Sequence, residues 1–114
     1  MLLTLYGCGA IIAGGAAGGA TYVYTEGWVE RDYDVGIDQA YYAGLQAAEN
    51  LNMAVVEQNK EMASASIKMK KGEGDYWIKM EEKAKKRTTI SVRAGVLANK
   101  KASQKIHQEI DELI

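Results

Sequence analysis

The stretch Ala63-Ser64-Ala65-Ser66-Ile67-Lys68-Met69-Lys70 alternates small or apolar residues with polar ones at every step. Successive side chains of a β-strand point to opposite faces, so this strand would have one apolar and one polar face. That pattern is typical of an antiparallel sheet with one face against a core and the other in water. Residues 71–75 (Lys-Gly-Glu-Gly-Asp) follow directly and predict a hairpin loop.

Strand-like segments continue on both sides of this hairpin. Residues 76–82 and 88–96 alternate again, and residues 83–87 form a charged turn between them. Earlier in the chain, residues 28–33 and 53–58 contain the β-branched and aromatic residues that favour strands. We therefore expect a sheet of about five strands, four of which follow one another along the chain.

Two segments have the periodicity of amphipathic helices. The first runs from Ile37 to Leu51, and the second begins after Asn99, a residue suited to the N-cap. Gly44 lies in the middle of the first helix, where glycine costs about 1 kcal/mol relative to alanine, so it predicts close packing on a sheet. The predicted buried positions are Ile37, Tyr41, Leu45, Ala48 and Leu51 in the first helix and Ala102, Ile106, Ile110 and Leu113 in the second.

The resulting order, β-α-β-β-β-β-α, predicts an α+β fold. Two amphipathic helices would cover one face of the antiparallel sheet and complete a two-layer sandwich. The chain has 114 residues, which suffices for one domain with a modest core, and its 47% apolar composition is that of a globular protein.

The net charge of −1 conceals a strong asymmetry along the chain. Residues 1–67 sum to −6, residues 68–105 to +8, and residues 106–114 to −3. A basic middle could bind nucleic acid or anionic lipid. No nucleic-acid motif accompanies the charge, and lysines on a solvated sheet face are the simpler interpretation.

The first 25 residues carry no charge and include the one cysteine of the chain. The sequence Leu5-Tyr6-Gly7-Cys8, followed by a Gly/Ala tract, resembles the end of a bacterial lipoprotein signal peptide. In that pattern the peptidase cuts before the cysteine, whose thiol takes a diacylglyceryl group. The resemblance implies a residual signal peptide at 1–7, a lipidated Cys8 with its tether at 8–25, and an α+β domain at 26–114.

Two or three acyl chains would anchor such a domain, since each buried methylene contributes roughly 0.8 kcal/mol. Signal peptides begin with basic residues, and none precedes Cys8, so we expect the true start upstream or a trimmed chain. A second interpretation is a membrane helix over 1–25, in which Gly14-x-x-x-Gly18 and Gly15-x-x-x-Gly19 pack against copies or partners. A third is an incidental thiol in a flexible leader.

The order of elements extends the resemblance to nearly the whole chain. Tyr33 before the first helix, Val55-Val56 after it and the strand Thr89-Ile90-Ser91-Val92-Arg93 are similar to an uncharacterised family of small bacterial lipoproteins. The resemblance implies a membrane-tethered protein on the periplasmic side of a bacterial membrane. Of the two membranes we expect the outer one, although the sequence itself leaves the choice between inner and outer open. It implies no activity.

No set of residues predicts catalysis. His107 is the one histidine and lies beside the predicted buried stripe, so we interpret it as a residue at the edge of the core. No second histidine or cysteine of the domain could join it as a metal ligand or nucleophile. The adjacent Glu81 and Glu82 would point to opposite faces of a strand and cannot form a carboxylate pair. We expect a protein that is not an enzyme and needs no metal or cofactor.

The polar face of the predicted sheet is the first place to look for a ligand. A basic, aromatic sheet face can bind an anionic polymer, although solvated lysines around one tryptophan produce the same pattern. The candidate residues, called the ligand face below, are Lys68, Lys70, Trp77, Lys79 and Arg93.

Together these features predict a membrane-anchored lipoprotein with a non-catalytic domain for binding or envelope assembly. Its expected partners are the membrane, through covalent lipid, and other envelope proteins or an anionic lipid or polymer, but not nucleic acid. The oligomeric state is left open. The alternative is a structural subunit whose N-terminal glycine-zipper helix packs in the membrane.

Overall fold

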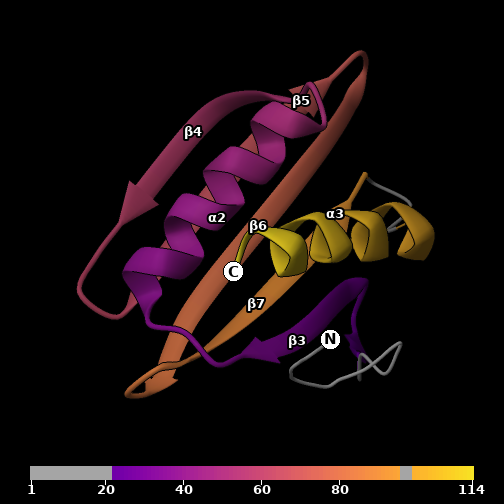
Figure 1. Ribbon diagram of the computed structural model, residues 1–114. Helices are drawn as coiled ribbons and strands as arrows, with labels where there is room; N and C mark the ends of the chain where they lie inside the picture. The colour runs from indigo at the N-terminus through magenta and orange to yellow at the C-terminus, as the bar shows by residue number, and fades with distance from the viewer. Residues whose placement is uncertain (1–21, 96–98) are drawn as a thin grey trace.

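The computed structural model describes residues 22–95 and 99–114, which form an open six-stranded sheet with two helices on one face (Figure 1). The predicted α+β sandwich and its order of elements are therefore confirmed. The elements are β2 (Val23–Thr25), β3 (Trp28–Tyr33), α2 (Ile37–Asn50), β4 (Ala54–Lys60), β5 (Ser64–Lys71), β6 (Gly74–Ala84), β7 (Arg87–Ala94) and α3 (Lys100–Leu113).

All neighbouring strands of the sheet are antiparallel, in the order β2-β3-β7-β6-β5-β4. The strands β4 to β7 form a meander, whereas β3 comes from early in the chain to pair with β7. Figure 1 shows both helices on the same side of the sheet, with α2 packed mainly on β4, β5 and β6, and α3 on β7 and β3.

The covered face of the sheet is apolar because every second residue of the central strands is apolar. Ile67, Ile78 and Val92 are direct neighbours on β5, β6 and β7, and at most 1% of each is exposed. Val29 on β3 continues this row. Each such side chain contributes about 1.5–3 kcal/mol by leaving water, so the row is the centre of the core.

Helix α2 lies close to the sheet at Gly44, as predicted. A Cβ atom added there would lie 2.6 Å from Cε of Met80 and 3.0 Å from Cδ1 of Ile67. The start of α2 is held by the sheet as well, because the Ile37 N–H donates to Oε2 of Glu82 at 3.1 Å. A carboxylate at this end also interacts favourably with the helix dipole.

The buried stripe of α2 is made of smaller residues than predicted. Ile37, Tyr41 and Ala48 are buried as expected, but Leu45 and Leu51 are only partly buried. Small residues take the closest positions instead, since they let the helix axis approach the sheet. They are Ala40, Ala43, Gly44 and Ala47.

Helix α3 begins as predicted, but its buried face is rotated, because Ser103 and His107 are buried whereas Ala102, predicted to be buried, is only partly so. The Asn99 side chain accepts a hydrogen bond from the Ala102 N–H at 3.1 Å, which confirms the N-cap. Ile106 and Ile110 are fully buried, whereas Leu113 is 37% exposed and the prediction that it is buried is wrong. Leu113 is the last residue of the helix, where the chain has passed the edge of the core.

Both predicted hairpin turns are shorter than expected, and the turn predicted at 83–87 is only Lys85-Lys86. The loop predicted at 71–75 is only Gly72-Glu73, because β5 extends to Lys71 and β6 begins at Gly74. The sixth strand, β2, precedes the predicted domain start and joins β3 through a tight turn at Glu26 and Gly27, with φ values of 50° and 87°.

Candidate functional site

The structure brings most of the ligand face together on the open side of the sheet. Lys68, Trp77 and Arg93 are direct neighbours across β5, β6 and β7. Because adjacent strands lie about 4.8 Å apart, their side chains form a continuous row. Lys79 lies two residues from Trp77 on β6, on the same side of the sheet, and is exposed.

Trp28 on β3 extends this row beyond Arg93. The Nζ atom of Lys79 lies 4.3 Å from the centroid of the Trp28 ring, although β7 runs between their two strands. The Lys79 side chain reaches the ring across Ser91, a small residue that is only 9% exposed. Such a cation–π contact contributes about 0.5–1 kcal/mol at an exposed site, so the indole holds the ammonium group in place.

The other two cations of the row are also held. The Nζ atom of Lys68 lies 5.9 Å from the centroid of the Trp77 ring. Nη1 of Arg93 donates to the Glu26 carbonyl oxygen at 3.0 Å. A side chain already held in this way loses less conformational entropy on binding, so the row is pre-organised.

Lys70 stands apart from the row. It is the direct neighbour of Asp75, and its Nζ atom lies 3.8 Å from Oδ1 of that residue. This distance allows an ion pair but no hydrogen bond, which agrees with Oδ1 being buried without a hydrogen-bond partner. The charge of Lys70 is therefore partly offset by Asp75, and it adds less to the attraction of an anion.

The other half of the open face is acidic. Asp32, Thr89 and Glu81 are direct neighbours on β3, β7 and β6. The Thr89 hydroxyl donates to Oδ1 of Asp32 at 2.5 Å. A hydrogen bond from Lys83 lowers the pKa of the Glu81 carboxyl. An anionic ligand would be attracted to the aromatic and cationic half and repelled by this one.

Trp28 is the member of the row that the sequence analysis did not identify. Its indole is partly buried and lies on the open face, because the adjacent Val29 is buried on the covered face. The alternation of these two residues was visible in the sequence. The pairing of β3 with β7, which brings Trp28 beside Arg93, joins distant segments and leaves no local pattern.

His107 lies inside the core, and the prediction that it is at the edge is wrong. It is 0% exposed. Its Nε2 atom lies 2.7 Å from the Val29 carbonyl oxygen and its Nδ1 atom 2.8 Å from the Tyr33 hydroxyl. Because a carbonyl oxygen only accepts, Nε2 carries the proton and Nδ1 accepts from Tyr33.

This buried pair is structural in character. Burial lowers the pKa of His107 to about 4, and it raises the pKa of the Tyr33 hydroxyl. The imidazole is therefore neutral at pH 7, and both of its nitrogens are engaged with β3. The contacts join α3 to the sheet through hydrogen bonds that no apolar residue could make.

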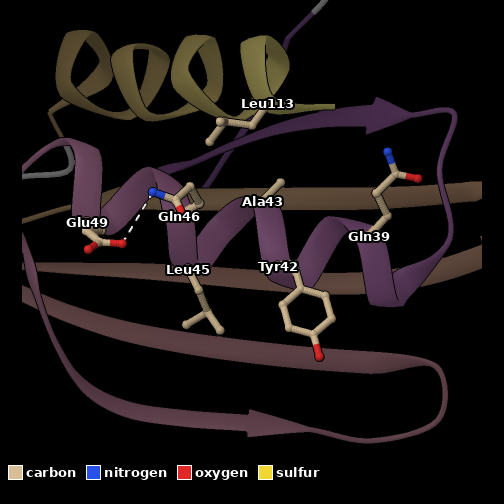
Figure 2. Close-up of a pocket in the computed structure, with 7 residues that line it drawn as sticks. All are labelled: Gln39, Tyr42, Ala43, Leu45, Gln46, Glu49 and Leu113. Atoms are coloured by element: carbon tan, nitrogen blue, oxygen red, sulfur yellow. Dashed lines mark hydrogen bonds between the residues drawn. The ribbon is translucent and has the colours of Figure 1, made fainter.

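A shallow depression of about 360 Å³ lies on the outer surface of α2 (Figure 2). Tyr42, 71% exposed, forms one wall, and Nε2 of Gln46 donates to Oε1 of Glu49 at 3.3 Å beside it. One carboxylate and two amides do not form an acid–base pair. The lining residues are Gln39, Tyr42, Ala43, Leu45, Gln46, Glu49 and Leu113.

Within residues 22–95 and 99–114, no three His, Cys, Asp or Glu side chains lie close enough together to hold a metal ion. Neither helix of this part of the chain is long and apolar enough to cross a membrane. Cys8 and the glycine-rich segment beside it lie outside the described residues.

These features define a class of small α+β domains with one helix-covered sheet face and one open face bearing aromatic and cationic side chains. The chain belongs to the family described as "Protein of unknown function (DUF3568)", whose model matches residues 1–113. The expected membership in an uncharacterised family is thereby confirmed. No curated protein matches the chain.

Proposed function

We propose that this chain is a membrane-anchored bacterial lipoprotein whose non-catalytic domain binds a linear anionic polymer of the cell envelope. Cys8 is the lipid attachment site, and the domain lies on the periplasmic side of the outer membrane. The observation that carries the binding function is the row in which Trp28 holds Lys79, and Trp77 lies between Lys68 and Arg93.

The shape of the row favours a linear ligand. It crosses four adjacent strands, which corresponds to about 14 Å at the usual strand spacing. The acidic row of Asp32 and Glu81 runs beside it on the same face. A polymer chain along Lys68, Trp77 and Arg93 would pass beside Asp32 and Glu81 and meet only Glu30, which lies across Ser91 from Lys79. A flat anionic surface would have to contact all three carboxylates.

The anchor is supported by residues 5–8, which match the lipoprotein pattern with a small residue before the cysteine. A tether of this kind keeps the domain near the bilayer and raises its effective concentration for envelope components.

The intact mass of membrane-extracted protein tests the anchor. We expect cleavage before Cys8 and a mass increase that corresponds to two or three acyl chains. A Cys8→Ser variant should move to the soluble fraction. A free thiol with Met1 retained, and a Cys8→Ser variant that stays in the membrane, would instead support the glycine-zipper helix.

Binding to dextran sulfate, with uncharged dextran as control, tests the ligand face. Lys79→Gln should weaken binding by up to about fivefold, the value of one exposed charge pair near 1 kcal/mol. Lys105→Gln, which removes an exposed lysine from α3, is the matched control and should have little effect. Equal effects of the two substitutions, or binding that does not weaken with salt, would contradict the proposal.

A further inference from the structure

The turn between β6 and β7 projects beyond the rest of the sheet. The two strands pair as far as Ala84 and Arg87. The paired part of β5 begins opposite Glu81, and β3 ends opposite Thr88, so neither neighbouring strand reaches residues 83–87. Figure 1 shows this hairpin tip projecting at the lower edge of the sheet, past the ends of its neighbours.

The hairpin tip, residues 83–87, is strongly basic. Four of its five residues are cations and all five are exposed. Lys83 forms an ion pair with Glu81. Within the described part of the chain, no carboxylate pairs with the other three, which are Lys85, Lys86 and Arg87.

The backbone of the tip is strained at a lysine. Lys86 has a φ of 58°, in the left-handed region that glycine and asparagine adopt most easily. A two-residue hairpin loop requires φ values of this kind, so the strain belongs to the turn between Ala84 and Arg87. This turn position nonetheless carries an exposed lysine, where glycine would adopt the same φ without strain.

We propose that this hairpin tip contacts the phosphate groups of an anionic lipid bilayer and so orients the domain on the membrane. The inference rests on the proposed function in one respect, because Cys8 is what brings the domain to the bilayer. Thirteen residues separate Cys8 from Tyr22. Fully extended they span about 45 Å, so the tether is long enough for a domain whose longest dimension is 38 Å.

The form of the tip favours a bilayer over a polymer. Its three charges lie on consecutive residues at the end of a hairpin. A layer of lipid headgroups can contact all three at once, whatever the rotation of the domain about the hairpin axis. The acidic row of Asp32 and Glu81 lies between the tip and the cations of the ligand face. The two basic regions are therefore separate, so the ligand face remains exposed when the tip is at the membrane.

Co-sedimentation with lipid vesicles tests the proposal on the full-length Cys8→Ser chain. Vesicles of equal parts phosphatidylglycerol and phosphatidylcholine should bind it more tightly than vesicles of phosphatidylcholine alone, and salt should remove the difference. The combined variant Lys85→Gln, Lys86→Gly, Arg87→Gln should lose on the order of 100-fold in affinity, since each cation contributes about fivefold near an anionic membrane.

A variant with the same change of charge is the control. Lys68→Gln, Lys70→Gln and Lys79→Gln together remove three cations from the ligand face, and this variant should keep its affinity for the anionic vesicles. Equal losses in the two triple variants would overturn the proposal. So would a hairpin variant that binds vesicles normally but no longer binds dextran sulfate.

The single substitution Lys86→Gly separates strain from binding. We expect about fivefold weaker vesicle binding together with a higher temperature of unfolding, because glycine relieves the backbone at this position. A lower unfolding temperature would contradict the role given to strain. Since the Cys8→Ser chain carries no lipid, a failure here is distinct from a failure of the anchor, which the intact mass reports.

Discussion

The two faces of the sheet are built from the same strands but differ in what their side chains contact. Ile78 is 1% exposed and packs beneath α2, whereas the next residue, Lys79, is exposed and lies over the Trp28 ring. On the covered face a side chain is fixed by close packing from several elements. On the open face it is fixed by one or two contacts and remains available to a ligand. We therefore expect that stability and the proposed binding can be altered separately at adjacent positions.

The largest contrast is expected between Ile78→Ala and Lys79→Ala. The first substitution should lower the free energy of unfolding by about 3–4 kcal/mol, because it leaves a cavity between α2 and the sheet. The second should lower it by less than about 1 kcal/mol, the value of an exposed cation–π contact. Urea denaturation of the two variants measures both values. Similar losses of unfolding free energy in the two variants would show that the open face also contributes to the stability of the fold.

The next contrast is one of pH, and it concerns His107 on the covered face. Its pKa is about 4 in the folded chain and 6.5 as a free imidazole, so the unfolded chain binds the proton first. The neutral imidazole of His107 therefore contributes its full stabilisation above pH 6.5. As the pH falls toward 4, the free energy of unfolding decreases by about 3 kcal/mol in all. Urea denaturation at several pH values measures the loss.

His107→Gln is the control for this pH dependence. The variant should be less stable at neutral pH, but its stability should fall less steeply in the same pH window because no imidazole is present to titrate. An equally steep fall would assign the pH dependence to carboxylates elsewhere.

A smaller effect is expected at Tyr33, the partner of His107. Tyr33→Phe leaves Nδ1 of the buried imidazole without a donor, which should cost about 1–3 kcal/mol of unfolding free energy. The matched control is Tyr42→Phe, since that hydroxyl belongs to a side chain that is 71% exposed. Thermal unfolding should distinguish the two, and an unstable Tyr42 variant would contradict this assignment.

The smallest effect concerns the contact between Trp28 and Lys79 on the open face. A double-mutant cycle of Trp28→Ala and Lys79→Ala should give a coupling energy of about 0.5–1 kcal/mol, because the ring and the ammonium group contact each other directly. The same cycle with Lys105 in place of Lys79 should give a coupling near zero. A coupling absent from both cycles would mean that the contact does not hold Lys79 in solution.

The meander, both helices and the Gly44 contact could be predicted because their signals are local. Alternation along one strand indicates which residues share a face. It correctly predicts the open face for Lys68, Trp77, Lys79 and Arg93. The contribution of Trp28 could not be predicted, since it depends on the pairing of β3 with β7. The burial of His107 was missed for a related reason, because its partners Tyr33 and Val29 lie on that same strand.

The pairing of β3 with β7 also has a consequence for the order of folding. The meander needs only short loops to close, but residues 29–33 must find residues 88–92 across most of the domain. Closing so long a loop carries a larger entropy cost and slows folding, so we expect β2 and β3 to join the sheet last. During synthesis, β2 and β3 can pair with each other, but this hairpin has no sheet to join until β7 has emerged from the ribosome. Any processing at that cysteine in the meantime would act on a chain whose sheet is still incomplete.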